Sequence, residues 1–233
     1  MRPLTILVMW LVADWKWLTP NLVTTMANVA KLIGAVLLAL DHHTHAVGAV
    51  LWIQLGLLLD HLDGTIARYR GCGTAFGAFY DKVSDAVTWL AIMSAIGWAA
   101  YHDHGDVRLA IAASASAYAL LTLGYMKWMI AAQEAGTKAP AALPHDPPQR
   151  TRREWAMWFL SSIGRIVRFE EVDLFFWIAV GVLAQRMDLL VILLLVSQAV
   201  QLCIMLTVRT KQALALDTKR AAAAAAAVES PAA

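Results

Sequence analysis

Four aspartates lie close together in the first half of the 233-residue chain: Asp60, Asp63, Asp81 and Asp85. The first two are three positions apart and the last two are four apart, so each pair shares one face of a helix. The short turn Gly71-Cys72-Gly73-Thr74 lies between the pairs and is expected to fold the two helices back on each other. The spacing therefore predicts that the four carboxylates, here called the aspartate cluster, converge between two helices.

Carboxylates packed this closely cannot all stay ionised unless cations are present. Hard oxygen ligands favour Mg²⁺, Mn²⁺ or Ca²⁺ over zinc. Two such ions about 3.5–4 Å apart form the usual clamp for phosphoryl transfer. A salt-bridge network between helices is the alternative, but it would have only Arg68, Arg70 and Lys82 to neutralise four acids. The cluster therefore predicts a two-metal site for phosphate chemistry.

Small and basic residues share the faces of these two helices. Gly64 and Gly77 have no side chains, so a ligand or the neighbouring helix can approach closely. Arg68 lies one turn beyond Gly64 on the same face, where its guanidinium could hold a phosphate oxygen.

The composition places these helices in a membrane. Hydrophobic residues make up 60% of the chain and charged residues 15%, against about 25% charged in ordinary soluble domains. The net charge of +2, from 19 basic and 17 acidic side chains, is too balanced to indicate a nucleic-acid partner. The two cysteines, Cys72 and Cys203, predict no disulfide framework.

The hydropathy pattern predicts an all-α polytopic membrane protein. A bilayer span takes about 20 residues, and six segments meet this requirement: 20–41, 46–69, 75–101, 106–131, 170–186 and 188–210. We expect three parts: an interfacial amphipathic helix at 1–18 with tryptophans at headgroup level, a six-helix transmembrane catalytic domain at 19–211, and a low-complexity cytoplasmic tail at 212–233.

Basic residues are distributed unevenly between the two sides of this predicted topology. Sixteen lysines and arginines fall on the side of the two termini, whereas only Arg108 and Arg186 fall on the other. This asymmetry predicts cytoplasmic termini and a cytoplasmic aspartate cluster in the cell's inner membrane. Lys31 falls inside the first span, where snorkelling is difficult, so one expectation is an interior position between helices.

The aspartate cluster resembles the motif of the CDP-alcohol phosphotransferase family. The family pattern is Asp-x-x-Asp-Gly-x-x-Ala-Arg, eight further residues, and Gly-x-x-x-Asp-x-x-x-Asp. This chain reads DHLDGTIAR, YRGCGTAF and GAFYDKVSD, and it matches all eight specified positions. The segment Thr19-Pro20-Asn21-Leu22-Val23-Thr24 also resembles the Pro-Asn-x-x-Thr segment with which the family's first span begins.

The resemblance implies a reaction in phospholipid biosynthesis. A hydroxyl of a polar acceptor attacks the β-phosphorus of a CDP-alcohol, expected to be CDP-diacylglycerol, and CMP leaves. By the same match Asp85 accepts the proton of the attacking hydroxyl, and two Mg²⁺ or Mn²⁺ ions are the implied cofactors. A homodimer is implied by the resemblance alone. The implied metal ligands are Asp60, Asp63, Asp81 and Asp85, and the implied CDP-alcohol pocket residues are Gly64, Ala67, Arg68 and Gly77.

The acceptor is not determined by the motif; glycerol 3-phosphate, inositol phosphate and serine all remain open. Arg165 and Arg168 lie just before the fifth predicted span and could bind an acceptor phosphate. Attraction to anionic lipid headgroups is the alternative role for these two arginines.

Two other functions remain as alternatives. One is a CDP-choline or CDP-ethanolamine type enzyme that acts on diacylglycerol. The other is a divalent-cation transporter that uses the same carboxylates. Transporters usually show internal repeats and interrupted helices at the membrane midplane, and this sequence shows no such repeat.

Five histidines fall in two loops on the side opposite the aspartate cluster: His42, His43, His45, His102 and His104. Imidazoles near Asp41, Asp103 and Asp106 could bind a transition metal. Loop histidines at an interface are more often solvated, and this is the expectation for them.

Overall fold

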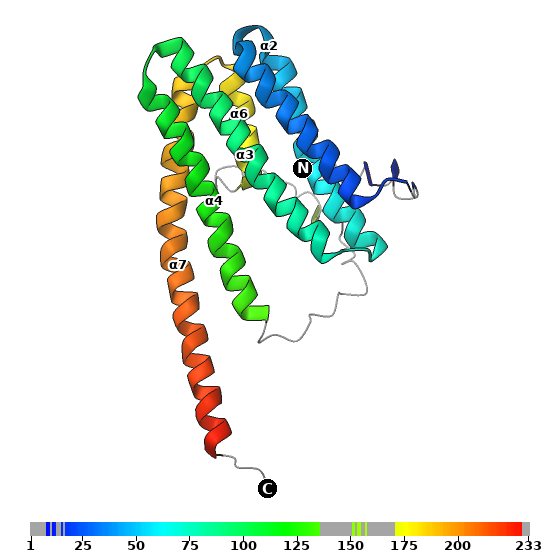
Figure 1. The fold of residues 1–233 in the computed structure, drawn as a ribbon, viewed down its shortest axis with the longest axis vertical. Helices are drawn as coiled ribbons and strands as arrows, with labels where there is room; N and C mark the ends of the chain where they lie inside the picture. Colours follow the sequence, from blue (N-terminus) through cyan, green and yellow to red (C-terminus); the bar gives the residue numbers. More distant parts are fainter. Residues whose placement is uncertain are drawn as a thin grey trace. The chain divides into compact units, whose positions relative to one another are not determined.

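The computed structural model describes residues 8–9, 11–12, 15, 17–135, 151, 153–154, 157 and 171–229, without the side chains of 135, 171–172 and 222–229. These residues form helices and contain no strand, which confirms the all-helical class. The helices, drawn in Figure 1, are α2 (Pro20–Arg70), α3 (Ala75–His104), α4 (Val107–Ala135), α6 (Glu171–Leu183) and α7 (Met187–Glu229).

Four of the described helices are long and apolar enough to cross a membrane: α2, α3, α4 and the Met187–Ala221 part of α7. The membrane class predicted from composition agrees with this finding. Six separate spans are not established. The expected spans 20–41 and 46–69 both fall within α2, and the expected span 170–186 corresponds to α6, which has 13 residues.

Helix α2 consists of two halves that fold back on each other at Asp41, whose backbone is extended rather than helical (φ −166°, ψ 96°) (Figure 1). A Cβ atom on Gly34, in the first half, would lie 2.9 Å from the carbonyl oxygen of Ala49 in the second. A Cβ atom on Gly56 would lie 2.8 Å from the carbonyl oxygen of Ala27. Glycine at these two contacts therefore allows the backbones of the two halves to approach closely.

A glycine turn joins the second half of α2 to α3, as the sequence predicted. Gly71 ends α2 in the left-handed region, with φ 61°, where glycine carries no Cβ penalty. Thr74 begins α3, and its hydroxyl accepts a hydrogen bond of 3.0 Å from the backbone N–H of Gly77. The two ends of this turn therefore determine where the motif residues on each helix face each other.

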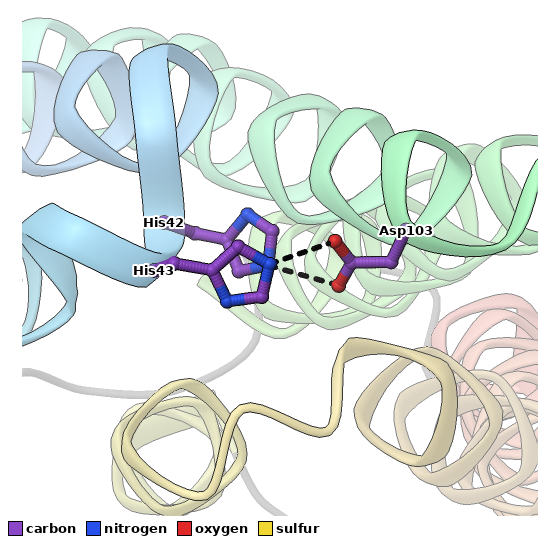
Figure 2. A group of neighbouring side chains, drawn as sticks. All are labelled: His42, His43 and Asp103. Carbon is purple, nitrogen blue, oxygen red and sulfur yellow. Dashed lines mark hydrogen bonds and ion pairs between the residues drawn. The ribbon is translucent and has the colours of Figure 1, made fainter.

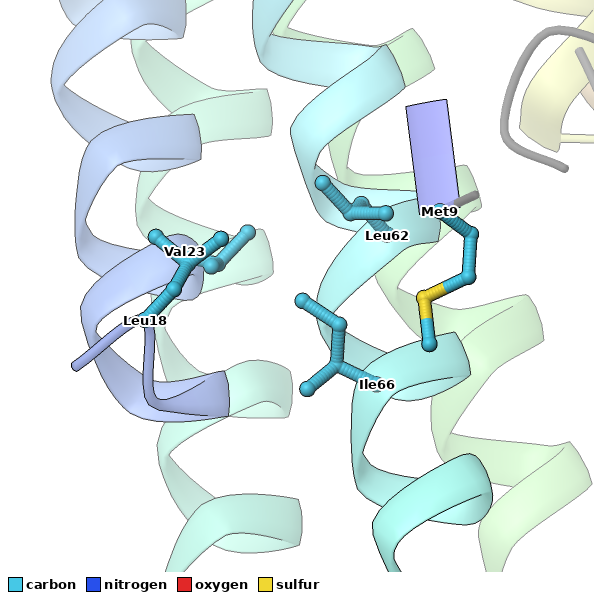
Figure 3. Packing of buried hydrophobic residues seen from close by; sticks show 5 residues of the cluster. All are labelled: Met9, Leu18, Val23, Leu62 and Ile66. Carbon is cyan, nitrogen blue, oxygen red and sulfur yellow. The ribbon is translucent and has the colours of Figure 1, made fainter. Parts of the chain in front are cut away.

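The segment before α2 packs against both halves of that helix. Met9 and Leu18 join Val23 from the first half and Leu62 and Ile66 from the second in one buried apolar cluster (Figure 3). Burying these side chains holds the two halves together by the hydrophobic effect.

Arg70 fixes the same segment by its backbone. Its Nη1 donates to the carbonyl oxygen of Leu18 at 2.7 Å, and its Nη2 donates to that of Trp15 at 2.9 Å. Most of the interfacial helix expected at 1–18 lies outside the described residues, so that helix stays a prediction.

The chain divides into two compact units, Met1–Ala117 with Ile166–Val196, and Tyr118–Arg165 with Ser197–Ala233. The aspartate cluster and the helices that position it belong to the first unit. In the second unit α7 continues as helix to Glu229, through the segment 212–229 that the sequence assigned to the tail.

We expect Gly34→Ala to destabilise the fold, because the added methyl group would collide with the backbone of the other half of α2. Overpacking of this kind costs about 1–3 kcal/mol. Gly48→Ala is the matched control, since its Cβ atom would meet only Leu37, at 3.6 Å. The control should be neutral or more stable by up to about 1 kcal/mol. Thermal unfolding in detergent measures both variants, and equal midpoints would contradict the close approach.

Candidate active site

Three of the four aspartates meet at one point. Asp60 comes from the second half of α2, and Asp81 and Asp85 come from α3. One carboxylate oxygen from each lies within 4.8 Å of the other two. The convergence predicted from the helical spacing is therefore observed for these three residues.

Asp63 lies one turn from Asp60 and is held by hydrogen bonds instead. The hydroxyl of Thr24, in the first half of α2, donates to its Oδ2, and the backbone N–H of Gly64 donates to its Oδ1. The Asp63 side chain is thereby fixed beside the other three carboxylates. The Thr24 donor comes from the helix half to which the sequence assigned no site residue.

A buried lysine joins the helices that carry the cluster. The Nζ of Lys31 lies 2.8 Å from Oδ1 of Asp60 and 3.3 Å from Oδ1 of Asp85. Lys31 is 1% exposed. It therefore occupies the interior position that was one of the expectations for it. A charge buried in an apolar setting needs such partners.

Lys82 contributes a second ammonium group at the edge of the cluster. Its Nζ lies 2.9 Å from Oδ2 of Asp81 and 3.0 Å from Oδ2 of Asp85. Two ammonium groups therefore contact three of the four carboxylates, and the six side chains together carry two formal negative charges. This excess of negative charge would favour a bound cation.

A pocket of about 540 Å³ opens beside the cluster. The first turn of α2, the last turns of its second half, and the beginning of α3 contribute its walls. All four residues that the sequence predicted for a CDP-alcohol pocket line it, together with two aspartates of the cluster. The lining residues used below are Asn21, Thr24, Asp63, Gly64, Ala67, Arg68, Gly77 and Asp81.

The two glycines of the motif lie where other side chains need the space. A Cβ atom on Gly64 would lie 3.3 Å from Nη1 of Arg68, so the guanidinium extends over this glycine. A Cβ atom on Gly77 would lie 3.2 Å from Oδ1 of Asn21 and 3.1 Å from the hydroxyl of Thr74. Polar atoms from three segments thus border the pocket without intervening side chains.

Sequence reasoning did not assign a role to Thr24 or Asn21, although both belong to the Pro-Asn-x-x-Thr segment that it singled out. That segment was the available signal, and it pointed to the first turn of α2. Arg165 and Arg168, predicted to bind an acceptor phosphate, lie outside the described residues. Their role stays a prediction.

The family model described as CDP-alcohol phosphatidyltransferase matches residues 17–147 of this chain. This range contains the aspartate cluster, the glycine turn and every residue of the pocket, and it covers more than half of the sequence. The chain therefore belongs to the CDP-alcohol phosphatidyltransferase family.

Several curated relatives share the name phosphatidylinositol phosphate synthase. The protein from Mycobacteroides abscessus is 31% identical over 129 residues, 55% of this chain and 57% of that protein. The protein from Mycobacterium tuberculosis is 37% identical over 86 residues, 36% of this chain and 39% of that protein. The matches thus span 39% to 57% of the length of these two relatives.

A solved structure shows a more extended likeness. The crystal structure of Mycobacterium tuberculosis phosphatidylinositol phosphate synthase in complex with manganese and citrate aligns with 84% of this chain and 86% of its own. The sequence identity is 27% and the TM-score is 0.49. The family assignment rests on the sequence match.

We expect Lys31→Met to destabilise the metal-free protein strongly, because Asp60 and Asp85 would lose a buried counter-charge. Breaking a buried pair costs about 3–5 kcal/mol. Lys82→Met is the matched control, since the Lys82 side chain is 48% exposed and exposed pairs contribute about 1 kcal/mol or less. Thermal unfolding with a chelator present compares them, and equal losses would contradict a structural role for Lys31.

Proposed function

We propose that this protein transfers a phosphatidyl group from CDP-diacylglycerol to a hydroxyl of an inositol phosphate and releases CMP. The observation that carries the proposal is the assembly of the family motif around one pocket: three aspartates meet beside it, and Asp63, Gly64, Ala67, Arg68 and Gly77 line it or border the cluster. The name shared by the relatives supports inositol phosphate over glycerol 3-phosphate or serine as the acceptor.

The donor atoms of the cluster suit divalent cations. Carboxylate oxygens are the ligands that Mg²⁺ and Mn²⁺ prefer, and the cluster has more negative than positive groups. Two such ions would be held by Asp60, Asp63, Asp81 and Asp85. Bound there, they would neutralise charge on the phosphates of the donor.

Asp85 would serve as the proton acceptor. The acceptor's hydroxyl oxygen forms a bond to the β-phosphorus of the donor, the bond from that phosphorus to the CMP oxygen breaks, and the hydroxyl proton passes to the Asp85 carboxylate. Lys31 and Lys82 contact its two oxygens at 3.3 and 3.0 Å. Both lysines thus hold this carboxylate in one orientation, which is the contribution of this chain to the step.

The pocket suits the nucleotide part of the donor. Its volume of about 540 Å³ falls in the range of roughly 300–1,000 Å³ typical of small-molecule sites. Arg68 extends over Gly64 at its wall, where the planar guanidinium can pair with phosphate oxygens. The glycines keep the floor of the pocket open for the ligand.

We also propose the membrane arrangement that the sequence predicted. The two halves of α2, together with α3, α4, α6 and α7, would supply six spans. The excess of basic residues supports cytoplasmic termini and a cytoplasmic pocket, where CMP could leave into water. Arg165 and Arg168 would bind the acceptor phosphate, and two copies of the chain would form a homodimer.

We expect Asp85→Asn to lower CMP release by about 10²- to 10⁴-fold, because a general base contributes that much to proton transfer. The assay uses purified protein, Mg²⁺ or Mn²⁺, CDP-diacylglycerol, and inositol phosphate, glycerol 3-phosphate or serine supplied singly. Asp217→Asn, an aspartate of α7 outside the motif, is the control and should retain full activity.

Other patterns of activity would overturn particular parts of the proposal. Release with glycerol 3-phosphate or serine but not inositol phosphate would replace the acceptor. Release only with CDP-choline or CDP-ethanolamine and diacylglycerol would replace the donor. Folded protein that releases no CMP with any pair, yet carries Mn²⁺ into vesicles, would favour a cation transporter.

We expect Thr24→Val to raise the Mg²⁺ concentration needed for half-maximal activity by about 10- to 100-fold, the usual effect of losing a residue that orients a metal ligand. The reason is that Asp63 would lose the hydroxyl that fixes its Oδ2. Thr25→Val is the matched control, because Thr25 contacts Asn21 and Tyr80 instead. The metal requirement separates this positioning role from a general loss of stability, and an unchanged requirement in Thr24→Val would refute it.

A further inference from the structure

A second group of metal-ligating side chains lies at the other end of α3. His42 and His43 follow the break in α2, and Asp103 lies in the last turn of α3. His42 Nε2 is 2.9 Å from Oδ2 of Asp103, and His43 Nε2 is 3.1 Å from its Oδ1 (Figure 2). With 1.5 Å of rise per residue, Asp103 is about 27 Å along the helix from Asp85, so this group is separate from the proposed active site.

The partners of His43 suit a cation at this group. Its Nδ1 faces Oε1 of Gln185 at 2.7 Å, and its Nε2 faces the Asp103 carboxylate. A neutral imidazole has one donor and one acceptor nitrogen, whereas both of these partners are acceptors. A second proton on His43, or a metal ion between Nε2 and the carboxylate, resolves this conflict.

The Gln185 amide is held in the orientation that creates the conflict. Its Nε2 donates to the carbonyl oxygen of His42 at 3.3 Å, which leaves Oε1 facing His43. Gln185 has a backbone φ of 56°, a left-handed conformation uncommon for residues other than glycine. A side-chain carbonyl that accepts the Nδ1 proton of a histidine is also the usual support for a histidine that binds metal through Nε2.

We propose that His42, His43 and Asp103 form a binding site for Zn²⁺ or a similar transition-metal ion. Two imidazole nitrogens and one carboxylate oxygen suit Zn²⁺, with water completing a tetrahedral site. The Nε2 atoms of His42 and His43 lie 2.9 and 3.1 Å from carboxylate oxygens of Asp103, near the roughly 3.3 Å edges of a tetrahedron with bonds of about 2.0 Å.

The exposure of the three side chains suits an ion that binds from solvent. The His42 side chain is 6% exposed and the Asp103 side chain 18%, whereas the His43 side chain is 61% exposed. Two ligands are thus fixed in the protein, and the third faces water. A bound ion would link the break in α2, the end of α3 and the turn before α7, so we assign the site a structural role.

Zinc binding to the full-length protein in detergent tests the proposal. The protein is first stripped with a chelator, and excess Mg²⁺ is then added so that the aspartate cluster does not compete for Zn²⁺. Calorimetry should give one equivalent of Zn²⁺ with a Kd of about 1 µM or tighter. Co²⁺ should give the visible absorption of a four-coordinate site with histidine ligands.

Variants identify the ligands. His43→Ala, at an exposed position, and Asp103→Asn should each weaken Zn²⁺ binding by more than about 100-fold, since even the supports of metal ligands matter 10- to 100-fold. His45→Ala is the matched control, because the Nδ1 of His45 contacts the backbone carbonyl of Asp41, and it should bind as the unchanged protein does. Asp60→Asn should also leave this binding unchanged.

Three results would overturn the proposal. The first is no Zn²⁺ binding by folded protein at micromolar concentration, which would leave a proton as the cation on His43. The second is equal binding by the unchanged protein and His43→Ala. The third is loss of the Zn²⁺ equivalent in Asp60→Asn, which would place the ion in the aspartate cluster. None of these depends on CMP release, so the test stands apart from the proposed function.

Discussion

The ion pairs of Lys31 with Asp60 and Asp85 are the constraint on which the rest of the site depends. Lys31 lies in the first half of α2, Asp60 in the second half and Asp85 in α3, so one buried ammonium group joins three helical segments. A charge in such a setting is costly unless its partners are in place. The glycine contact at Gly56, whose Cβ atom would collide with Lys31, keeps the two halves close enough for the pair to form. The ion pairs, together with apolar packing, therefore determine how the three helical segments are aligned along their axes.

The sequence predicted much of this arrangement because helical spacing and turn chemistry are local properties. Asp60 with Asp63, and Asp81 with Asp85, share helix faces by their spacing, and the glycine turn brings these faces together. The partners of Lys31 and the Thr24 contact to Asp63 were not predictable in the same way. They depend on how the first half of α2 packs against the other segments, and the spacing of residues within one helix does not determine that.

The expectations for the fold also divide into local properties, which the sequence predicted, and contacts between distant segments, which it did not. The apolar segments 20–41 and 46–69 are helical, as expected, but their separation by a single extended residue, Asp41, within one continuous element was not expected. The histidines beside this break were expected to be solvated. Instead, His42 is buried against Asp103, because residues near the break approach the end of α3 only once three segments have packed. Contacts of this kind join positions about sixty residues apart, and no local pattern reports them.

The position of Lys31 also has a consequence for how the protein is made. The first half of α2 precedes Asp60 in the chain, and by itself it would carry an unpaired charge into lipid. The second half supplies Asp60 and also the glycine contact that brings it close. Insertion of the two halves as one helical hairpin delivers the lysine to the bilayer already neutralised, whereas insertion one segment at a time does not. The ion pair thus favours insertion of the two halves of α2 together.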